Sequence, residues 1–261
     1  MELRNAAIVL EDGTVIEGKS FGAKKISGGE LVFHTGMSGY QEILSDPSYS
    51  GQIVVMTYPH IGNYGINAED RESSTLHLSG FVVGQYQPLH RHWRSEESLH
   101  DHLHRFDVPG IFDVDTRMLT RKIRNQGSMK AVITSLEDLD QAKEMLLEMP
   151  PMEGQNLIAK VSTSKSYVWK SQDMSTGKGS LVVIDCGVKY NILRCFEELG
   201  ISCVVLPPDS TREEILEYKP SGIFLSNGPG DPAAIEGLPA VVESFFGELP
   251  IFGICLGHQM L

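Results

Sequence analysis

The alternation of apolar runs and helical segments after residue 180 constrains the fold most strongly. Leu181–Ile184 is a continuous apolar run, typical of a strand that is covered on both faces. A helical segment over residues 190–199 follows and ends at Gly200. This alternation continues to the end of the chain, so we predict right-handed crossovers and a parallel sheet. The further strands are expected at 203–206, 222–225 and 251–254, and the further helices at 211–218, opened by a capping box, and at 238–246.

Residues 1–150 have a different pattern, which predicts a mixed β/α domain. Ala6–Leu10 and Val15–Gly18 flank an Asp-Gly dipeptide, and such a pair of short runs indicates a β-hairpin. Further strands are expected at 31–33 and 52–57, and a helix at 136–149 that Pro150 and Pro151 end. Residues 151–179 are rich in Ser, Thr, Lys, Gly and Pro and are predicted to be a linker. The expected domains are therefore 1–150 and 180–261.

Composition excludes several classes of protein. The 261 residues carry 22 Lys+Arg against 34 Asp+Glu, a net charge of -12, which argues against nucleic acid as a partner. No apolar run is long enough to span a bilayer, and residues 1–5 do not resemble a secretory signal, so neither a membrane nor secretion is expected. The four cysteines show no CxxC spacing, which favours reduced thiols and a cytoplasmic protein.

The most informative motif is Gly253-Ile254-Cys255-Leu256-Gly257, directly after a predicted strand. It has the form Gly-x-Cys-x-Gly, the cysteine counterpart of a nucleophile elbow. Flanking glycines remove the Cβ atoms that would clash in so tight a bend, and the cysteine would sit exposed at a helix N-terminus, where the dipole favours a thiolate. The alternative is a buried, inert cysteine; the elbow pattern favours the nucleophile.

A second loop, Ser226–Pro232, follows the predicted strand at 222–225. Its glycines allow backbone N–H groups to approach a ligand, although a plain turn is the alternative. Because both loops follow parallel strands, both are expected at the same edge of the sheet. A thiolate beside backbone donors is what acyl transfer requires.

These two motifs resemble those of class I glutamine amidotransferases. Segments 39–49, 58–65 and 115–121 resemble the N-terminal domain of the small, glutamine-hydrolysing subunit of carbamoyl phosphate synthetase, and 185–194 resembles the first strand–helix unit of its amidotransferase domain. The resemblance runs nearly end to end. It implies an α/β fold with an N-terminal mixed β/α domain, followed by an incomplete, flavodoxin-like class I amidotransferase domain with a parallel sheet.

The resemblance also implies a role for individual residues. Cys255 matches the nucleophile, which forms a γ-glutamyl thioester. Gly230 and Leu256 match the oxyanion donors, and Gly228, Gln259 and Ser48 match positions that bind glutamine. The implied partner is the large synthetase subunit, which receives ammonia and uses bicarbonate and ATP. ATP and Mg are expected on that subunit; no cofactor and no metal is expected on this chain.

One departure from the family concerns the general base, a His that a Glu two residues later orients. His258 lies within the elbow helix and does not match it. The sequence is therefore expected to be C-terminally truncated or incomplete, with little glutaminase turnover by itself. Two other functions are open: a stand-alone cysteine hydrolase of γ-glutamyl or peptide bonds, and a non-catalytic fragment that docks on the large subunit. Whether the product serves arginine or pyrimidine synthesis is not encoded in the motifs.

Two further clusters have structural interpretations. His90, His92, His100, His102 and His104 lie close in sequence, but apolar residues at helical spacing favour a surface helix over a metal site. Arg117, Arg121, Lys122 and Arg124 form a basic face, which we interpret as a salt-bridged helix in preference to an anchor for a partner subunit. Cys186, Cys195 and Cys203 are predicted to be inert packing residues.

Overall fold

The computed structural model describes residues 5–152, 154–169 and 179–261. The chain divides into two compact units. Unit 1 comprises residues 1–45 and 51–151, and unit 2 comprises 46–50 and 152–261. The short segment Asp46–Ser50 therefore groups with the C-terminal part of the chain, although it lies between two parts of unit 1 in the sequence. The domain limits at residues 150 and 180 stay a prediction.

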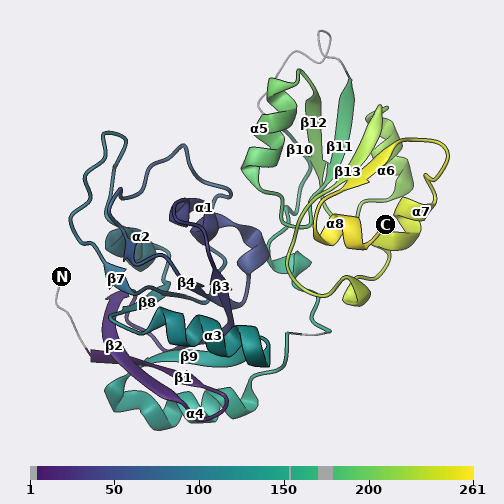
Figure 1. Cartoon of the computed structure of the whole chain (residues 1–261). Helices are drawn as coiled ribbons and strands as arrows, with labels where there is room; N and C mark the ends of the chain where they lie inside the picture. The colour runs from purple at the N-terminus through teal and green to yellow at the C-terminus, as the bar shows by residue number, and fades with distance from the viewer. Residues whose placement is uncertain (1–4, 153, 170–178) are drawn as a thin grey trace. The chain divides into compact units, whose positions relative to one another are not determined.

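Unit 1 is built on a closed barrel with strand order β1-β2-β8-β6-β4-β3-β9 (Figure 1). The expected hairpin is confirmed, since β1 pairs antiparallel with β2 and Ile8 lies opposite Ile16. Strand β9 closes the barrel because it pairs antiparallel with both β1 and β3. Alternate side chains, among them Ile8, Leu31 and Ile53, fill the interior. The strands are β1 (Asn5–Leu10), β2 (Val15–Gly22), β3 (Ser27–His34), β4 (Gln52–Met56), β6 (Gly80–Val82), β8 (Pro109–Phe112) and β9 (Met129–Ser135).

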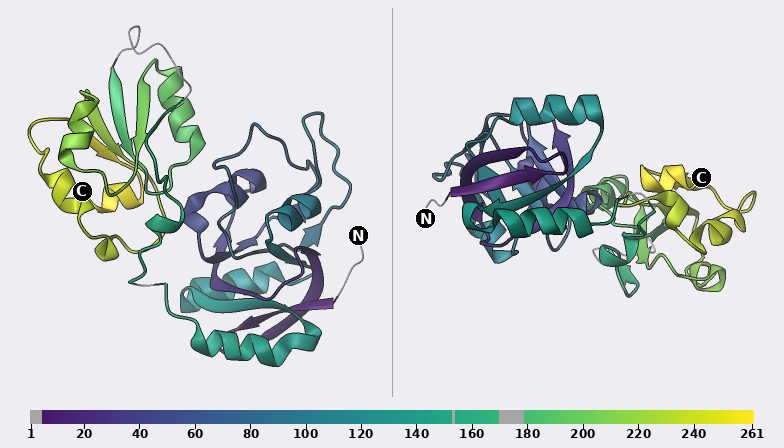
Figure 2. Two further views of the ribbon diagram at one scale, coloured as in Figure 1. Left: turned by 180° about the vertical axis from the view of Figure 1, so that it is seen from behind. Right: turned by 90° about the horizontal axis from the view of Figure 1, so that it is seen from below.

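Helices pack against the barrel in two ways: α3 (Thr116–Gln126) on the cluster that fills its interior and α4 (Leu139–Glu148) on its outward face (Figure 2). Helix α3 buries Leu119 and Ile123 against the main core. The helix expected at 136–149 begins as a 3-10 turn, η2 (Leu136–Asp138), and continues as α4 (Leu139–Glu148), which packs Ala142 and Leu146 on Val9 and Val132. The remaining elements are α1 (Tyr40–Ser45), α2 (Leu99–Arg105) and a two-strand pair of β5 (His60–Ile61) and β7 (Gln85–Tyr86).

Unit 2 contains the predicted parallel sheet, in the order β10-β12-β11-β13-β14. The parallel strands are β11 (Ser180–Ile184), β12 (Ser202–Leu206), β13 (Gly222–Leu225) and β14 (Ile251–Gly253). Strand β10 (Tyr167–Val168) is antiparallel to β12 and belongs to the segment expected to be a linker, as does η3 (Ile158–Lys160). Strand β10 has only two residues, which is too short for a hydrophobic pattern to be recognised within a polar segment.

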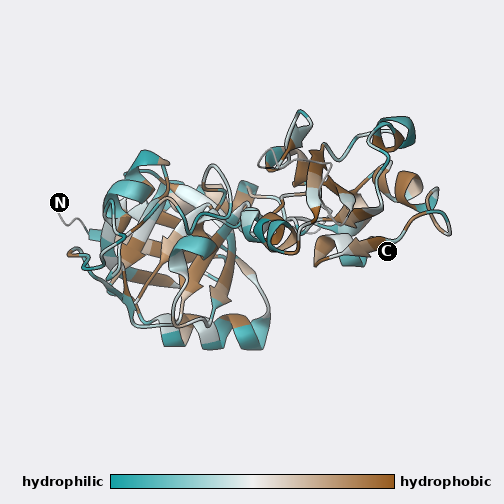
Figure 3. Ribbon diagram, turned by 90° about the horizontal axis from the view of Figure 1, so that it is seen from above, coloured by the Kyte–Doolittle hydropathy of each residue, from teal (hydrophilic) through white to brown (hydrophobic). Residues whose placement is uncertain are grey.

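Both faces of this sheet are covered. One face packs on a cluster that includes Leu238, Val242 and Phe245, and the other on a cluster that includes Leu193 and Phe196. The strands accordingly show as largely hydrophobic in Figure 3. The helices are α5 (Tyr190–Glu198), α6 (Arg212–Glu217), α7 (Leu238–Glu243) and α8 (Leu256–Gln259), and α6 has the predicted capping box at Thr211 and Glu214. Within the described ranges, no helix has the length and apolar character needed to cross a bilayer.

Candidate active site

Cys255 occupies the sharp turn between β14 and α8. Its backbone has φ 52° and ψ −115°. A positive φ is uncommon for a residue other than glycine and costs on the order of 1–3 kcal/mol, so the surrounding structure must hold this turn in place. The side chain is exposed. The alternative interpretation of Cys255, as a buried and inert packing residue, is therefore wrong.

The two glycines that flank the cysteine are required by close backbone contacts. A Cβ on Gly253 would lie 2.4 Å from the carbonyl carbon of Gly257, and a Cβ on Gly257 would lie 2.3 Å from the carbonyl oxygen of Leu225. The Gly257 N–H donates to the Ser226 carbonyl oxygen at 3.1 Å. The start of α8 is thus held against the carboxyl end of the neighbouring strand, β13.

The glycine-rich loop after β13 lies at the same edge of the sheet. A Cβ on Gly228 would be 2.1 Å from the Cys186 carbonyl oxygen and 2.9 Å from Cδ2 of Leu256. Gly230 has φ +90°, and a Cβ there would be 2.7 Å from the Gln155 carbonyl oxygen. The loops that follow β11, β13 and β14 therefore meet at this edge, as the parallel arrangement predicts.

Ser48 joins this edge through the segment 46–50 of unit 2. Asp46 caps the 3-10 helix η1 (Pro47–Tyr49), and its Oδ1 accepts the Ser48 N–H at 2.9 Å. The Ser48 Oγ accepts a hydrogen bond from Nδ2 of Asn227 at 3.0 Å. Lys189 Nζ lies 3.4 Å from Asp46 Oδ2, which adds an ion pair between the segment and the loop after β11.

Asp185 fixes the loop that follows β11. Its side chain is 5% exposed, and its Oδ1 accepts the N–H groups of Gly187 at 2.9 Å and of Val188 at 2.8 Å. Its Oδ2 accepts the N–H of Thr163 at 2.7 Å. The sequence motifs predicted no role for Asp185 or Asn227. The available signal was their position, since each is a polar residue at or next to the carboxyl end of an apolar strand.

The structure brings Cys255, Leu256, Gly228, Gly230 and Ser48 to one edge of the unit 2 sheet. Gln259 lies one turn along α8, is exposed, and its N–H donates to the Cys255 carbonyl oxygen at 2.9 Å. His258 is exposed on the same short helix. The structure gives the positions of these residues, and their roles in binding and catalysis stay predictions.

Three residues of the histidine cluster, His100, His102 and His104, lie on α2, as the apolar spacing indicated, whereas His90 and His92 lie in the chain before it. Leu99 and Leu103 of α2 are fully buried. His100 Nδ1 accepts the Gly22 N–H at 2.9 Å. His102 is 2% exposed, and its Nδ1 lies 2.6 Å from Glu97 Oε1, while burial lowers the pKa of its ring. Within the described residues, no group of three or more His, Cys, Asp or Glu side chains is arranged to hold a metal ion.

The basic face of α3 is salt-bridged only in part. Lys122 pairs with Asp12 and donates to the Thr14 hydroxyl at 2.7 Å. Arg117, Arg121 and Arg124 are exposed, and none of them forms an ion pair within the described part of the chain. The interpretation of this face as a salt-bridged helix is therefore confirmed for Lys122 and wrong for the three arginines.

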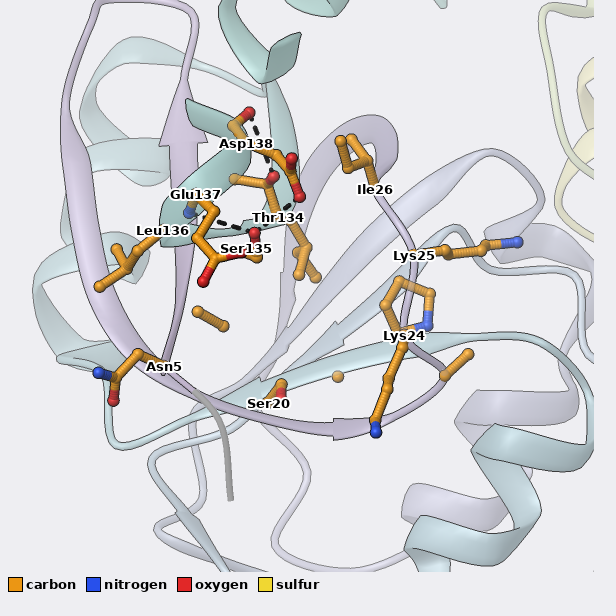
Figure 4. A pocket seen from close by; sticks show the side chains of 15 residues that line it. Asn5, Ser20, Lys24, Lys25, Ile26, Thr134, Ser135, Leu136, Glu137 and Asp138 are labelled. Carbon is orange, nitrogen blue, oxygen red and sulfur yellow. Dashed lines mark hydrogen bonds between the residues drawn. The ribbon is translucent and has the colours of Figure 1, made fainter. Parts of the chain in front are cut away.

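A pocket of about 650 Å³ opens at one mouth of the unit 1 barrel (Figure 4). Asn5, Ser20, Lys24, Thr134 and Glu137 are among its lining residues. Other polar groups at its rim already have partners within the protein, since the Ser135 hydroxyl donates to Asp138 at 2.7 Å and Lys25 pairs with Asp107 at 2.7 Å. The pocket contains no residue of the candidate site.

The prediction that the other three cysteines are packing residues is confirmed for Cys186 and Cys203 and wrong for Cys195, which is exposed on α5. Cys186 and Cys203 are 0% and 2% exposed, and burial raises the pKa of each thiol to about 12. At pH 8 only about one such thiol in 10⁴ is ionised, so we expect iodoacetamide to label both at least ~100-fold more slowly than exposed Cys195 and Cys255. Peptide mass spectrometry measures this, with guanidinium-unfolded protein, in which all four react, as the control. Equal labelling of all four in the folded chain would contradict the burial described above.

A cysteine on a strand–helix elbow, beside a glycine-rich loop at the carboxyl edge of a parallel sheet, is the arrangement expected of a class I amidotransferase domain. Residues 182–261 match the family model "Glutamine amidotransferase class-I", and residues 8–133 match "Carbamoyl-phosphate synthase small chain, CPSase domain". The chain is 48% identical to the carbamoyl phosphate synthase small chain of Nostoc sp., over 98% of its own length and 70% of the relative's. It is 45% identical to that of Aquifex aeolicus, over 99% and 72%, and 47% identical to that of Archaeoglobus fulgidus, over 98% and 70%.

The chain belongs to the carbamoyl phosphate synthase small chain family. The resemblance on which the sequence analysis relied is thereby confirmed, as is the expected fold class. Small chains of this family work with a large subunit and use glutamine.

Proposed function

We propose that Cys255 is the nucleophile of a glutaminase. Its Sγ attacks the carboxamide carbon of glutamine, the C–N bond breaks, and ammonia leaves with the proton it requires. A water molecule then attacks the resulting γ-glutamyl thioester and breaks the C–S bond. The sum is glutamine and water converted to glutamate and ammonia. The observation that carries this proposal is the exposed thiol of Cys255 at a strained elbow beside the loop 226–231.

Backbone N–H groups of Leu256 and Gly230 are the proposed donors to the oxyanion that forms during attack. Gly228, Gln259 and Ser48 are the proposed contacts to bound glutamine. The absence of side chains at residues 228 and 230 supports these assignments, because it lets the backbone approach a ligand closely. A small zwitterion of this kind needs fixed polar groups at both of its charged ends.

A complete turnover also needs a group that accepts the thiol proton and later delivers one to ammonia. His258 is the only histidine between residues 152 and 261, and it lies on the elbow helix itself. A side chain on the nucleophile's own short helix is poorly placed to face the thiol. We therefore propose that these 261 residues by themselves hydrolyse glutamine slowly.

The proposed partner is the large subunit, which would receive the ammonia and combine it with bicarbonate and ATP into carbamoyl phosphate. ATP and Mg belong to that subunit in this proposal. All four cysteines are free, which supports a cytoplasmic location. We propose residues 1–150 as the small-chain N-terminal domain, 151–179 as the connection, and 180–261 as the amidotransferase domain.

The proposal is tested with a chloromethyl ketone analogue of glutamine, in which the reactive group replaces the carboxamide. Attack by Sγ on the CH₂Cl carbon forms a C–S bond and releases chloride. We expect one label per chain, at Cys255, that excess glutamine slows at least ~10-fold, while ammonia release from glutamine stays near background. Mass spectrometry locates the label and an ammonia assay follows turnover.

Matched variants separate the possible functions. Cys255→Ser is expected to abolish the label, and Cys195→Ser, which removes the other exposed thiol, is expected to leave it unchanged. Labelling that glutamine does not slow would favour a docking fragment without a glutamine site. Rapid ammonia release by the chain without a large subunit would favour the stand-alone hydrolase.

A further inference from the structure

The side chain of Asn227 has no part in the chemistry proposed above, yet it is 2% exposed and fully engaged. Its Nδ2 donates to the Ser48 hydroxyl oxygen at 3.0 Å and to the Gly187 carbonyl oxygen at 2.9 Å. Its Oδ1 accepts the Lys189 N–H at 3.2 Å. One amide thus links three chain segments: the Ser48 turn, the loop after β11 and the loop after β13.

The backbone partners fix which way round the amide lies. A flipped side chain would place the NH₂ group against the Lys189 N–H, donor against donor, and the oxygen against the Gly187 carbonyl, acceptor against acceptor. The orientation with Nδ2 toward Ser48 is therefore the one that satisfies all three partners. At 2% exposure, solvent is not available to compensate a flip.

This orientation sets the polarity of the Ser48 hydroxyl. A hydroxyl has one proton to donate and two lone pairs to accept with. Because an amide NH₂ group only donates, Asn227 occupies a lone pair of Ser48 and leaves the proton free for another acceptor. The backbone of Ser48 is held as well, through its N–H to Asp46 and the ion pair of Asp46 with Lys189.

We infer that Asn227 is a positioning residue for glutamine: it presents the Ser48 hydroxyl as a hydrogen-bond donor toward the substrate's carboxylate. The inference rests on the proposed function and deepens it. Asn227 itself touches no reacting atom. Its contribution is to fix the direction of a group that would otherwise rotate, so that the rotation is restricted before the substrate binds.

The test measures KI and kinact for the chloromethyl ketone analogue in a double-mutant cycle. A hydrogen bond to a charged group is stronger than one between neutral groups, so Ser48→Ala is expected to raise KI at least ~10-fold. Asn227→Ala is expected to raise KI about as much, with kinact within ~2-fold. In the Ser48→Ala background, Asn227→Ala should then change KI less than ~2-fold, because the two residues act through one hydroxyl.

A purely structural role of Asn227 predicts a different pattern. The loss of three hydrogen bonds lowers the Tm in either case, but a purely structural role would also change the iodoacetamide rate at Cys255, and its effect on KI would persist in the Ser48→Ala background. Asn156→Ala is the matched control, since it removes one local hydrogen bond, to the Ile158 N–H, without contact to Ser48. If Asn227→Ala does not fold, Asn227→Asp keeps the shape and reverses the polarity toward Ser48, and it is expected to raise KI in the same coupled way.

The outcomes separate this inference from the proposed function. Glutamine-protected labelling of the unsubstituted chain, with KI unchanged in the folded Asn227 variants or additive with Ser48→Ala, overturns the positioning role alone. Absence of glutamine protection in the unsubstituted chain overturns the proposed function and this inference with it.

Discussion

Asp185→Ala is expected to lower the free energy of unfolding of unit 2 by about 4 kcal/mol, because three backbone N–H groups lose their acceptor at once. Two of them, from Gly187 and Val188, lie in a buried loop, and the third, from Thr163, joins that loop to the preceding segment. Each unsatisfied buried donor costs roughly 1–3 kcal/mol. The same loop contacts Asn227 and Gly228, so labelling by the glutamine analogue should fall as well.

Urea unfolding followed by tryptophan fluorescence measures this change. The chain has two tryptophans, and Trp93 is 87% exposed, so a Trp93→Phe background leaves Trp169 as the reporter for unit 2. The matched control is Asp231→Ala, whose carboxylate accepts the N–H groups of Ala233 and Gly154 at exposed positions and should cost about 1 kcal/mol. Equal losses for the two variants would contradict the buried anchoring role of Asp185.

The alternation of apolar runs was enough to predict the unit 2 sheet. Val182 and Val183 are both fully buried, on opposite faces of β11. A continuous run of apolar residues is typical of a strand whose two faces are both covered. The elbow could be predicted equally well from the sequence, because only glycine fits at residues 253 and 257, beside the carbonyl groups of Gly257 and Leu225. Local sequence carried these predictions because local sterics dictate the geometry.

The barrel of unit 1 could not be predicted in the same way. Its closure depends on the pairing of β9 with β1 and β3, which lie about a hundred residues earlier, and no local pattern specifies partners at that distance. Strands such as Gly80–Val82 are also too short to show a period. The edge strand β10 was not predicted either, because its two residues are too few to show a period.

The polar framework of the candidate site was missed for a further reason. Ser48, Asn227 and Asp185 come together only after two strands, β11 and β13, and a distant turn are in place. A single Asn or Asp after a strand is common in loops, and its side chain shows no preference for a partner in the sequence. The family resemblance supplied Ser48, but it gave nothing for the residues that hold it.

Gly257→Ala is expected to reduce labelling by the glutamine analogue at least ~100-fold, even though the cysteine is unchanged. The new Cβ would lie 2.3 Å from the Leu225 carbonyl oxygen and 2.8 Å from the Leu225 Cβ, so either α8 or the end of β13 must move. The Gly257 N–H bond to Ser226 then breaks, and the positions of Cys255 and the Leu256 N–H shift with it. A displacement of about 1 Å at a reacting group costs on the order of 100-fold in rate, and overpacking costs about 1–3 kcal/mol of stability.

Gly84→Ala is the matched control for this substitution. Its Cβ would meet Thr116 Oγ1 at 3.6 Å and the Pro59 carbonyl oxygen at 3.7 Å, which are ordinary contacts, so stability should change by less than about 1 kcal/mol. Comparison of kinact/KI with the iodoacetamide rate at Cys255 separates a displaced thiol from an unfolded one. A Gly257→Ala chain that retains the labelling rate of the unsubstituted chain would mean that the reactive cysteine does not depend on the elbow, because a shifted helix start cannot preserve both the thiol position and the adjacent donor.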